Sequence, residues 1–166
     1  ISRCNMSFSA VKEYFKQFNL ENRLLEFPVS SATVELAAIA LNCEPCKIAK
    51  TLSFLTKDNK VVLIVTAGDT KVNNHKFKAF FSMKAKMVPA DLTEELIGHS
   101  VGGICPFAVK ENVAVYLDNS LKRFATVFPA CGSSNSAIEL SLEELYKYSN
   151  AKAWIDVCEI KAPIKS

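Results

Sequence analysis

The spacing of apolar residues along the chain predicts five amphipathic helices. In the first of them, Val11, Phe15 and Phe18 recur every three to four positions, and lysine and glutamate occupy the opposite face. The predicted helices cover residues 7–19, 33–41, 72–81, 92–98 and 141–149. A helix with a single apolar face must be covered on that side, so these segments should surround a common core.

Short-range signals mark the ends of three of these helices. Thr33 and Asp91 stand at N-cap positions, and Ser141 with Glu144 forms the pattern of a capping box. Gly98 follows the fourth helix, where a residue in the left-handed conformation commonly ends the helix. These residues predict where the helices begin and end.

Seven shorter stretches are predicted to be β-strands. They cover residues 23–27, 48–56, 61–67, 86–88, 113–117, 124–130 and 152–158. The almost wholly apolar run at residues 61–67 predicts a central strand, and the polar residues 57–60 predict a hairpin before it. Hairpins mixed with helices, without regular βαβ alternation, predict an α+β fold with a curved, mixed sheet.

Length and composition fit one globular domain spanning residues 1–166, with 49% apolar and 22% charged residues. Met6 is a candidate natural start, which would make residues 1–5 a leader added for expression. The sequence contains neither a run of 18 apolar residues nor a secretory signal. We therefore expect a cytoplasmic protein that does not associate with membranes.

Basic residues are unevenly distributed, although the net charge is only +3. Residues 70–90 contain His75 and no acidic residue, together with five lysines: Lys71, Lys76, Lys78, Lys84 and Lys86. Such a cluster favours a phosphate-rich partner, and it is equally typical of a solvated helix face. The sequence leaves both interpretations open.

The six cysteines are expected to be free thiols, because the chain can form a core and lacks a secretion signal. Cys43 and Cys46 have the spacing of a redox pair, but a predicted helix precedes them where a thioredoxin-like motif requires a strand. A zinc site would need two further ligands, and the sequence offers no second pair. We expect neither a metal nor a cofactor.

The usual side chains of hydrolases are scarce. His75 and His99 are the only histidines, and no Gly-x-Ser-x-Gly motif is present, which argues against a Ser-His-Asp triad. His99 directly follows a predicted helix, and a capping role is favoured over a catalytic one. Cys105 and Cys131 carry no sequence signal of a lowered thiol pKa.

The segment at residues 98–107, called here the glycine loop, has the most distinctive composition in the chain. It holds three of the five glycines and a proline, which favour a rigid, bent loop with accessible amides. The amides of Gly102, Gly103 and Ile104 are candidates to stabilise an oxyanion that develops on an ester carbonyl. Lys50, within a predicted strand, is the candidate cation facing them. The nucleophile would be water or a hydroxyl of the substrate.

These segments together resemble the YbaK/prolyl-tRNA synthetase editing-domain family of aminoacyl-tRNA deacylases. The resemblance spans residues 11–157 and rests on Lys-Thr-Leu in a strand combined with Gly-Gly-x-x-Pro in a loop. The matching segments are residues 37–38 and 48–52, the apolar strand that ends at residue 67, and residues 98–107 and 132–140. The resemblance implies a partly closed barrel surrounded by helices. It also implies that the protein acts in trans and hydrolyses the ester between a small amino acid and a mischarged tRNA, above all the tRNA for proline.

The resemblance also implies roles for individual residues. Lys50 would contact the terminal adenosine region of the tRNA, and amides from Gly102 to Ile104 would position the carbonyl, with a ribose hydroxyl of the substrate assisting. The residues implied to line the substrate pocket are Phe27, Thr51, Cys105, Pro106, Cys131 and Gly132. The lysines of residues 71–86 would contact the acceptor stem, and an aminoacyl-tRNA synthetase is a further candidate partner.

This chain departs from its relatives at residues 130–135. Members directed at cysteine often carry Ser-Gly-Gly-Lys-Arg-Gly there, and members directed at alanine often carry a histidine, whereas this chain has neither. A small amino acid is expected without a specific identity. Two other interpretations stay open: a non-catalytic module that binds tRNA or a synthetase, and a thiol redox protein acting through Cys43 and Cys46.

Overall fold

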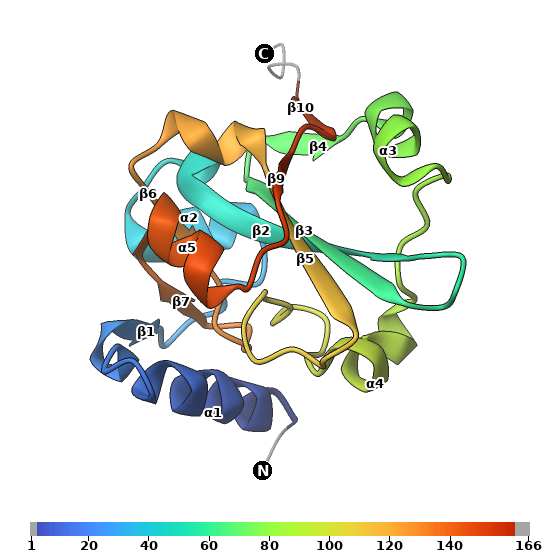
Figure 1. Ribbon diagram of the computed structural model, residues 1–166. Helices are drawn as coiled ribbons and strands as arrows, with labels where there is room; N and C mark the ends of the chain where they lie inside the picture. The colour runs from blue at the N-terminus through green and yellow to red at the C-terminus, as the bar shows by residue number, and fades with distance from the viewer. Residues whose placement is uncertain (1–2, 162–166) are drawn as a thin grey trace.

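A six-stranded sheet forms the centre of the molecule in the computed structural model, which describes residues 3–161 (Figure 1). Residues 1–2 and 162–166, which include the start of the expected leader, lie outside the described residues. The strand order is β8-β6-β2-β3-β5-β9. The bounds are β2 (Ile48–Leu55), β3 (Val61–Ala67), β5 (Val113–Asp118), β6 (Thr126–Pro129), β8 (Leu140–Ser141) and β9 (Trp154–Ile155).

Two small sheets and the helices surround this central sheet, as Figure 1 shows. The small sheets pair β1 (Leu24–Glu26) with β7 (Ser136–Ile138), and β4 (Thr70–Val72) with β10 (Cys158–Ile160). The helices are α1 (Arg3–Lys16), α2 (Val34–Leu41), α3 (Asn74–Phe81), α4 (Thr93–Ile97) and α5 (Leu142–Tyr148). Short 3-10 helices cover Glu21–Arg23, Pro45–Lys47, Ala90–Leu92 and Asn119–Arg123.

Strand directions confirm the predicted α+β fold with a mixed sheet. The β2–β3 hairpin is antiparallel from Ala49 opposite Ala67 to Leu55 opposite Val61, whereas β5 and β6 run parallel to their inner neighbours. Every residue of β3 is buried, which confirms that this apolar run is a central strand. Both faces of the sheet are therefore covered.

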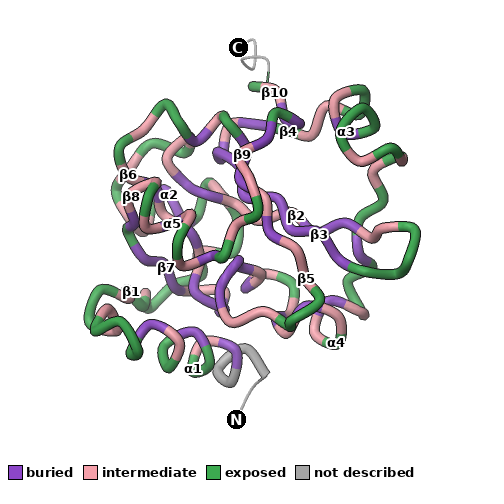
Figure 2. The backbone as a smooth tube through the Cα atoms, viewed as in Figure 1, coloured by how far each residue is buried: buried purple, intermediate pink, exposed green. Residues whose placement is uncertain are grey.

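The two larger apolar clusters cover the faces of the sheet, where Figure 2 shows the buried backbone. The larger cluster joins α1 to the glycine loop, and the rings of Phe15 and Phe107 meet at 4.8 Å. The smaller one lies beneath α3, where Phe77 contacts Phe54 of β2 at 5.0 Å. The glycine loop is thus attached to the main core through Phe107.

Three predicted helix ends are confirmed. The Thr33 side chain accepts a hydrogen bond from the Leu36 amide, Ser141 forms both halves of its capping box, and Gly98 ends α4 at φ +103°. The predicted cap at Asp91 is wrong, because Asp91 lies inside a 3-10 turn that precedes α4. The local pattern did not distinguish a 3-10 turn from the first turn of an α-helix.

The predicted strands differ from the structure near the edges of the sheet. The strand expected at residues 86–88 is a single bridge between Met87 and Phe54, and the one expected at residues 152–158 is divided into β9 and β10. The helix expected from residue 72 begins at Asn74, because residues 70–72 form β4. β4 forms a strand by pairing with β10, which lies more than 80 residues later in the sequence.

Two findings concern the whole described part of the chain. None of its helices combines the length and the apolar character needed to cross a membrane. Five cysteines in this part of the chain are free thiols: Cys43, Cys46, Cys105, Cys131 and Cys158.

Candidate functional site

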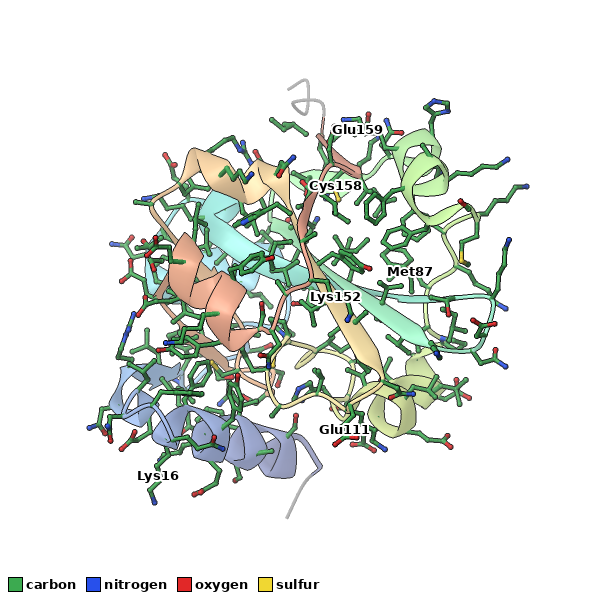
Figure 3. All side chains as sticks on the ribbon, viewed as in Figure 1. Lys16, Met87, Glu111, Lys152, Cys158 and Glu159 are labelled. Carbon is green, nitrogen blue, oxygen red and sulfur yellow. The ribbon has the colours of Figure 1, made fainter. Side chains whose placement is uncertain are left out.

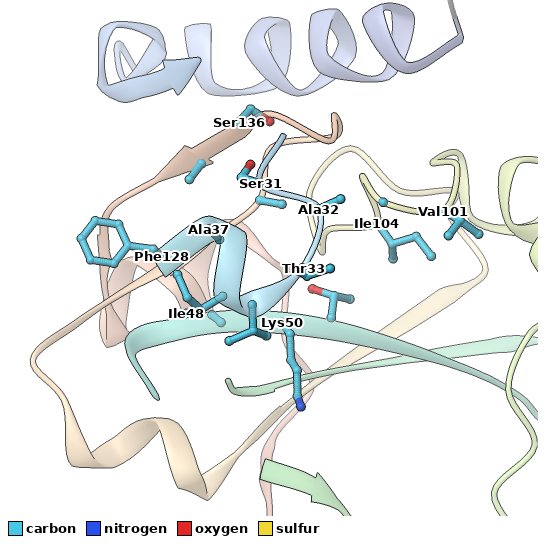
Figure 4. A pocket seen from close by; sticks show the side chains of 16 residues that line it. Ser31, Ala32, Thr33, Ala37, Ile48, Lys50, Val101, Ile104, Phe128 and Ser136 are labelled. Carbon is cyan, nitrogen blue, oxygen red and sulfur yellow. The ribbon is translucent and has the colours of Figure 1, made fainter. Parts of the chain in front are cut away.

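A cavity of about 240 Å³ lies between β2, α2 and the glycine loop, and we call it the β2 cavity. Its walls come from segments far apart in the sequence, as Figure 4 shows. Ala32 and Thr33 precede α2, Thr51 lies on β2, and Gly102 and Ile104 lie on the glycine loop. The fold therefore brings the predicted strand and the predicted loop to one hollow.

One wall of the β2 cavity is an open strand edge. The pairing of β2 with β6 ends at Ala49, and its pairing with the segment after α3 begins where Ser53 accepts from the Val88 amide at 3.0 Å. Backbone groups of alternate residues point to the same side of a strand, so Thr51 directs its N–H and C=O to the same edge as Ser53. Within residues 3–161, no strand pairs with this edge at Thr51.

The opposite wall is the glycine loop, and close backbone contacts explain glycine at position 103 of this loop and at position 132 of the turn packed against it. A Cβ on Gly103 would lie 2.7 Å from the carbonyl carbon and oxygen of Gly132, and one on Gly132 would lie 2.7 Å from the Ser7 carbonyl oxygen. Gly102 has φ +92°, which favours glycine. The glycine loop, the turn at residue 132 and α1 are thus stacked backbone against backbone.

The amides of the glycine loop differ in their availability. The Gly103 amide donates to the Ser100 carbonyl at 3.0 Å, so the expectation of a bare amide at Gly103 is wrong. Gly102 and Ile104 line the β2 cavity, and among the described residues no acceptor is found for either amide. The candidate oxyanion donors in this structure are therefore Gly102 and Ile104.

His99 links the glycine loop to α1 through a buried hydrogen-bonded ring. Its side chain is fully buried, its Nε2 lies 2.7 Å from the Phe107 carbonyl oxygen, and its Nδ1 contacts the Ser7 hydroxyl. A carbonyl only accepts, so Nε2 donates and Nδ1 accepts from Ser7. Burial lowers the pKa of His99, which favours this neutral form. The predicted capping role is wrong, because Gly98 ends α4.

Lys50 is half-buried and borders the β2 cavity, but its ammonium is directed elsewhere. Figure 4 shows the side chain pointing away from Val101 and Ile104, and its Nζ donates to the Thr70 carbonyl. Burial, followed by the nearby charge of Lys161, lowers the pKa of Lys50. Lys50 thus borders both the β2 cavity and a second hollow of about 370 Å³ between β2 and β4.

The other pocket residues expected from the resemblance are distributed differently. Thr51 lines the β2 cavity, whereas Phe27, Cys105, Pro106, Cys131 and Gly132 are not among its lining residues. Phe27 is instead bound to Asn135, whose side-chain amide donates to the Phe27 carbonyl at 2.9 Å. The aromatic ring at the cavity is Phe128 of β6. The parallel pairing that brings Phe128 beside Ile48 has no signal in the sequence.

The two cysteines near the glycine loop are fully buried. Burial raises the pKa of Cys105 to about 12 and raises that of Cys131 well above its ordinary value. A thiolate is the reactive form of cysteine, so neither side chain is suited to act as a nucleophile. Cys43 and Cys46 are partly buried, and this burial also raises their pKa values, which disfavours a redox role for that pair.

The predicted lysine cluster is partly neutralised by the C-terminal segment. Lys76 forms an ion pair with Asp156 at 2.9 Å, and Lys71 lies 3.7 Å from Glu159. The remaining members are exposed and have no ion pair among the described residues: Lys78, Lys84 and Lys86. Residues 70–90 contain no acidic residue, but the fold brings Asp156 and Glu159 close to two of their lysines.

A family model described as the aminoacyl-tRNA editing domain matches residues 29–148 of the chain. A Bacillus subtilis (strain 168) protein, described as the uncharacterized protein YwhH, is 51% identical over 154 residues, covering 93% of this chain and 98% of that one. A proline–tRNA ligase of Geobacillus sp. (strain WCH70) is 30% identical over 103 residues, covering 61% of this chain. The match spans only 18% of that ligase.

A solved structure also shares the fold. It is a crystal structure of a protein described as a candidate trans-editing enzyme for prolyl tRNA synthetase. It matches with a TM-score of 0.82 and 23% identity, covering 92% of this chain and 97% of that chain. The likeness confirms the curved, partly closed sheet with surrounding helices.

Proposed function

Because the chain belongs to the aminoacyl-tRNA editing domain family, we propose that it hydrolyses the ester of a small amino acid mischarged on tRNA. We propose the tRNA for proline as the carrier, because proline–tRNA ligases contain a segment similar to this chain. The chain would act in trans, in the cytoplasm, as a single editing domain, with prolyl-tRNA synthetase as a candidate partner.

The observation that carries this proposal is the pairing of an open strand edge with the glycine loop across one small cavity. Thr51 offers a backbone donor and acceptor from one wall, and Gly102 and Ile104 offer amides from the other. A volume of about 240 Å³ lies below the range of about 300–1,000 Å³ that is typical of drug-sized ligands. The cavity therefore suits a short aminoacyl group.

Ester hydrolysis at this cavity would rely on electrostatic stabilisation. Attack on the carbonyl places negative charge on its oxygen, and the Gly102 and Ile104 amides are held by a rigid loop to receive it. One such donor commonly contributes on the order of 10²–10³ in rate. Water is the proposed nucleophile, activated by a ribose hydroxyl of the substrate, because Cys105 and Cys131 are buried thiols.

Lys50 has a proposed role in holding the substrate beside the cavity. Its ammonium lies across β2 from the glycine loop, so it is placed to bind the nucleotide that carries the amino acid, and the carbonyl itself would meet the loop amides. A half-buried ammonium acts on an anion in a lower dielectric than bulk water and is therefore less screened.

A second candidate function is a non-catalytic module that binds tRNA or a synthetase. It is favoured by two observations: the Lys50 ammonium is engaged by Thr70, and the Gly103 amide is engaged by Ser100. Both groups would have to be catalytically unnecessary, or released by substrate, in a working deacylase.

The test is the rate of ester loss from tRNA for proline charged with alanine, cysteine or serine. The wild-type protein should accelerate hydrolysis of at least one of them, and Lys50→Ala should lower kcat/KM by tenfold or more. Lys57→Ala, at the exposed hairpin beyond β2, removes the same charge and should change nothing. Hydrolysis of every ester at the uncatalysed rate, with tRNA still bound, would establish the non-catalytic module instead.

A further inference from the structure

The side chain of His99 is a buried polar group that the proposed reaction does not use. The ring is fully buried, and it is not among the residues that line the β2 cavity. Its Nε2 is bound to the Phe107 carbonyl, and its Nδ1 is bound to the Ser7 hydroxyl. Burying a polar ring costs free energy even where its hydrogen bonds are made, and an apolar side chain would fill this space without that cost. The two hydrogen bonds are therefore the reason for a histidine here.

The hydrogen bond from His99 to Phe107 closes the glycine loop. The two residues are eight positions apart and bound a stretch that forms neither helix nor strand. The Phe107 ring packs against Phe15 in the main core, so the bond ties the start of the loop to a fixed end. Gly102 and Ile104, whose amides are the candidate oxyanion donors, lie between these ends. The distance that His99 spans therefore sets where the two amides stand.

The Nδ1 atom of His99 is bound from α1. Ser7 and Val11 are four residues apart on this helix and both are buried, so the Ser7 hydroxyl occupies a position on its inner face. Figure 3 shows Lys16, at the end of the same helix, pointing away from the rest of the molecule. The Ser7 carbonyl also stands against the turn at Gly132, where a Cβ would lie 2.7 Å from its oxygen. One residue of α1 thus holds both the ring and the turn that packs against the glycine loop.

His99 is not placed to act as a general base. Such a base must reach the proton that it removes within about 2.6–3.2 Å or through one water. The acceptor nitrogen of His99 is occupied by Ser7 inside the core, away from the β2 cavity. The titratable group that faces the ring is the Cys105 thiol, whose Sγ lies 3.5 Å from Nε2 and whose pKa burial raises to about 12. Any effect of His99 on the reaction must therefore pass through the glycine loop.

We propose that His99 is a positioning residue for the hydrolysis, which holds the ends of the glycine loop so that the Gly102 and Ile104 amides meet the substrate carbonyl. Ser7 is its partner and fixes the ring from α1. This inference rests on the proposed function and adds to it two residues that do not touch the substrate. A residue that served the core alone would contribute to stability, whereas a positioning residue also changes the chemical step. The two roles differ in their effect on kcat.

The test compares two substitutions of His99 in the deacylation assay. His99→Leu fills the space but has no donor for the Phe107 carbonyl. His99→Gln keeps the donor, because its Nε2 is as many bonds from the backbone as the histidine Nε2. A displacement of about 1 Å commonly costs on the order of 10² in rate, so His99→Leu should lower kcat about tenfold or more and change KM less than about twofold. His99→Gln should recover most of the lost kcat.

Two control variants separate position from stability. Phe77→Leu removes part of a buried ring in the apolar cluster beneath α3, so it should lower Tm and leave kcat unchanged. If His99→Leu does not fold, Ser7→Ala is the milder variant, because it removes the donor to Nδ1 and leaves the bond to Phe107. Ser7→Ala should lower kcat about threefold or more through a smaller displacement of the loop. Ser9→Ala, at an exposed position of the same helix, should change nothing.

Two results, measured well below every Tm, would overturn the assignment and leave the deacylase proposal intact. One is a kcat for His99→Leu equal to that of Phe77→Leu, and the other is an equal loss of kcat in His99→Leu and His99→Gln. If the wild-type protein hydrolyses no ester, the proposed function fails, and the position of the loop is followed by NMR. The amide signals of Gly102 and Ile104 should then shift in His99→Leu and return towards the wild type in His99→Gln. Signals as little changed in His99→Leu as in Phe77→Leu would reject the positioning role.

Discussion

Gly103→Ala is the substitution that most directly tests how the site is built. The added Cβ would lie 2.7 Å from the carbonyl carbon and oxygen of Gly132 and 2.9 Å from the Ser133 amide nitrogen. All three are backbone atoms, so no side-chain rotation can relieve the contact. Gly103 itself has no positive φ, so the expected effect is steric rather than conformational.

The size of the effect follows from these contacts. Carbon atoms pack at about 3.5–4.0 Å, so the glycine loop and the residue-132 turn would have to separate by roughly 1 Å. Overpacking of this kind costs about 1–3 kcal/mol, which for a chain of this size corresponds to a fall in Tm of roughly 2–12 °C. A displacement of about 1 Å at a catalytic group commonly costs on the order of 10² in rate.

The matched control is Gly98→Ala, in the same loop but not among the residues that line the β2 cavity. Gly98 has φ +103°, and its nearest neighbour would be the Ala108 carbonyl oxygen at 3.7 Å, so alanine there adds backbone strain without a clash. That strain costs about 1–2 kcal/mol. The two variants should therefore lose comparable stability in a thermal melt, and only Gly103→Ala should lose kcat in the deacylation assay.

Two results would refute this reasoning. A Tm for Gly103→Ala equal to that of the wild type would show that the backbones do not approach as closely as described, whatever the protein's activity. A kcat equal to that of Gly98→Ala, measured well below both melting temperatures, would show that the amides of this loop do not act on the carbonyl.

Three further predictions concern titration and reactivity. Because burial lowers the pKa of His99, stability should fall as the pH drops below about 6.5, and His99→Asn should remove that part of the pH dependence in urea melts. The hydrogen bond from Arg23 lowers the pKa of Glu144 to about 2, so the ionised Glu144 should stabilise the fold above about pH 4.3, and this contribution to the free energy of unfolding should be lost towards pH 2. In urea melts, Arg23→Ala should abolish this loss of stability. Iodoacetamide at pH 8 should leave Cys105 and Cys131 unmodified until the protein is unfolded, as mass spectrometry of the native protein would show.

Features that depend on neighbours in the sequence could be predicted from the sequence. The Thr33 cap, the Ser141 capping box and the Gly98 terminus each involve contacts within three or four residues, and all three are confirmed. The failure at Asp91 is of the same local kind, because a 3-10 turn and a first α-helical turn place the same residue types at their start.

Features that depend on distant segments could not be predicted in this way. The close approach of the Gly132 backbone explains why position 103 is glycine, and the close approach of Ser7 explains glycine at 132, yet nothing in the neighbouring sequence identifies these partners. The same holds for Phe128, which reaches the β2 cavity through a parallel pairing with Ile48. The resemblance placed an aromatic residue at the pocket, and the topology supplies one from a different strand.

The side chains of Lys50 and Thr51 leave β2 in opposite directions, and this arrangement constrains how one substrate could contact both. The sequence places Lys50 and Thr51 side by side, and strand alternation then requires their side chains to leave β2 on opposite faces. One substrate can engage both only by crossing the strand edge, which is possible because pairing is interrupted between Ala49 and Ser53. The proposed function therefore requires the gap in the sheet: a strand hydrogen-bonded across it would separate the lysine proposed to bind the nucleotide from the loop proposed to receive the carbonyl.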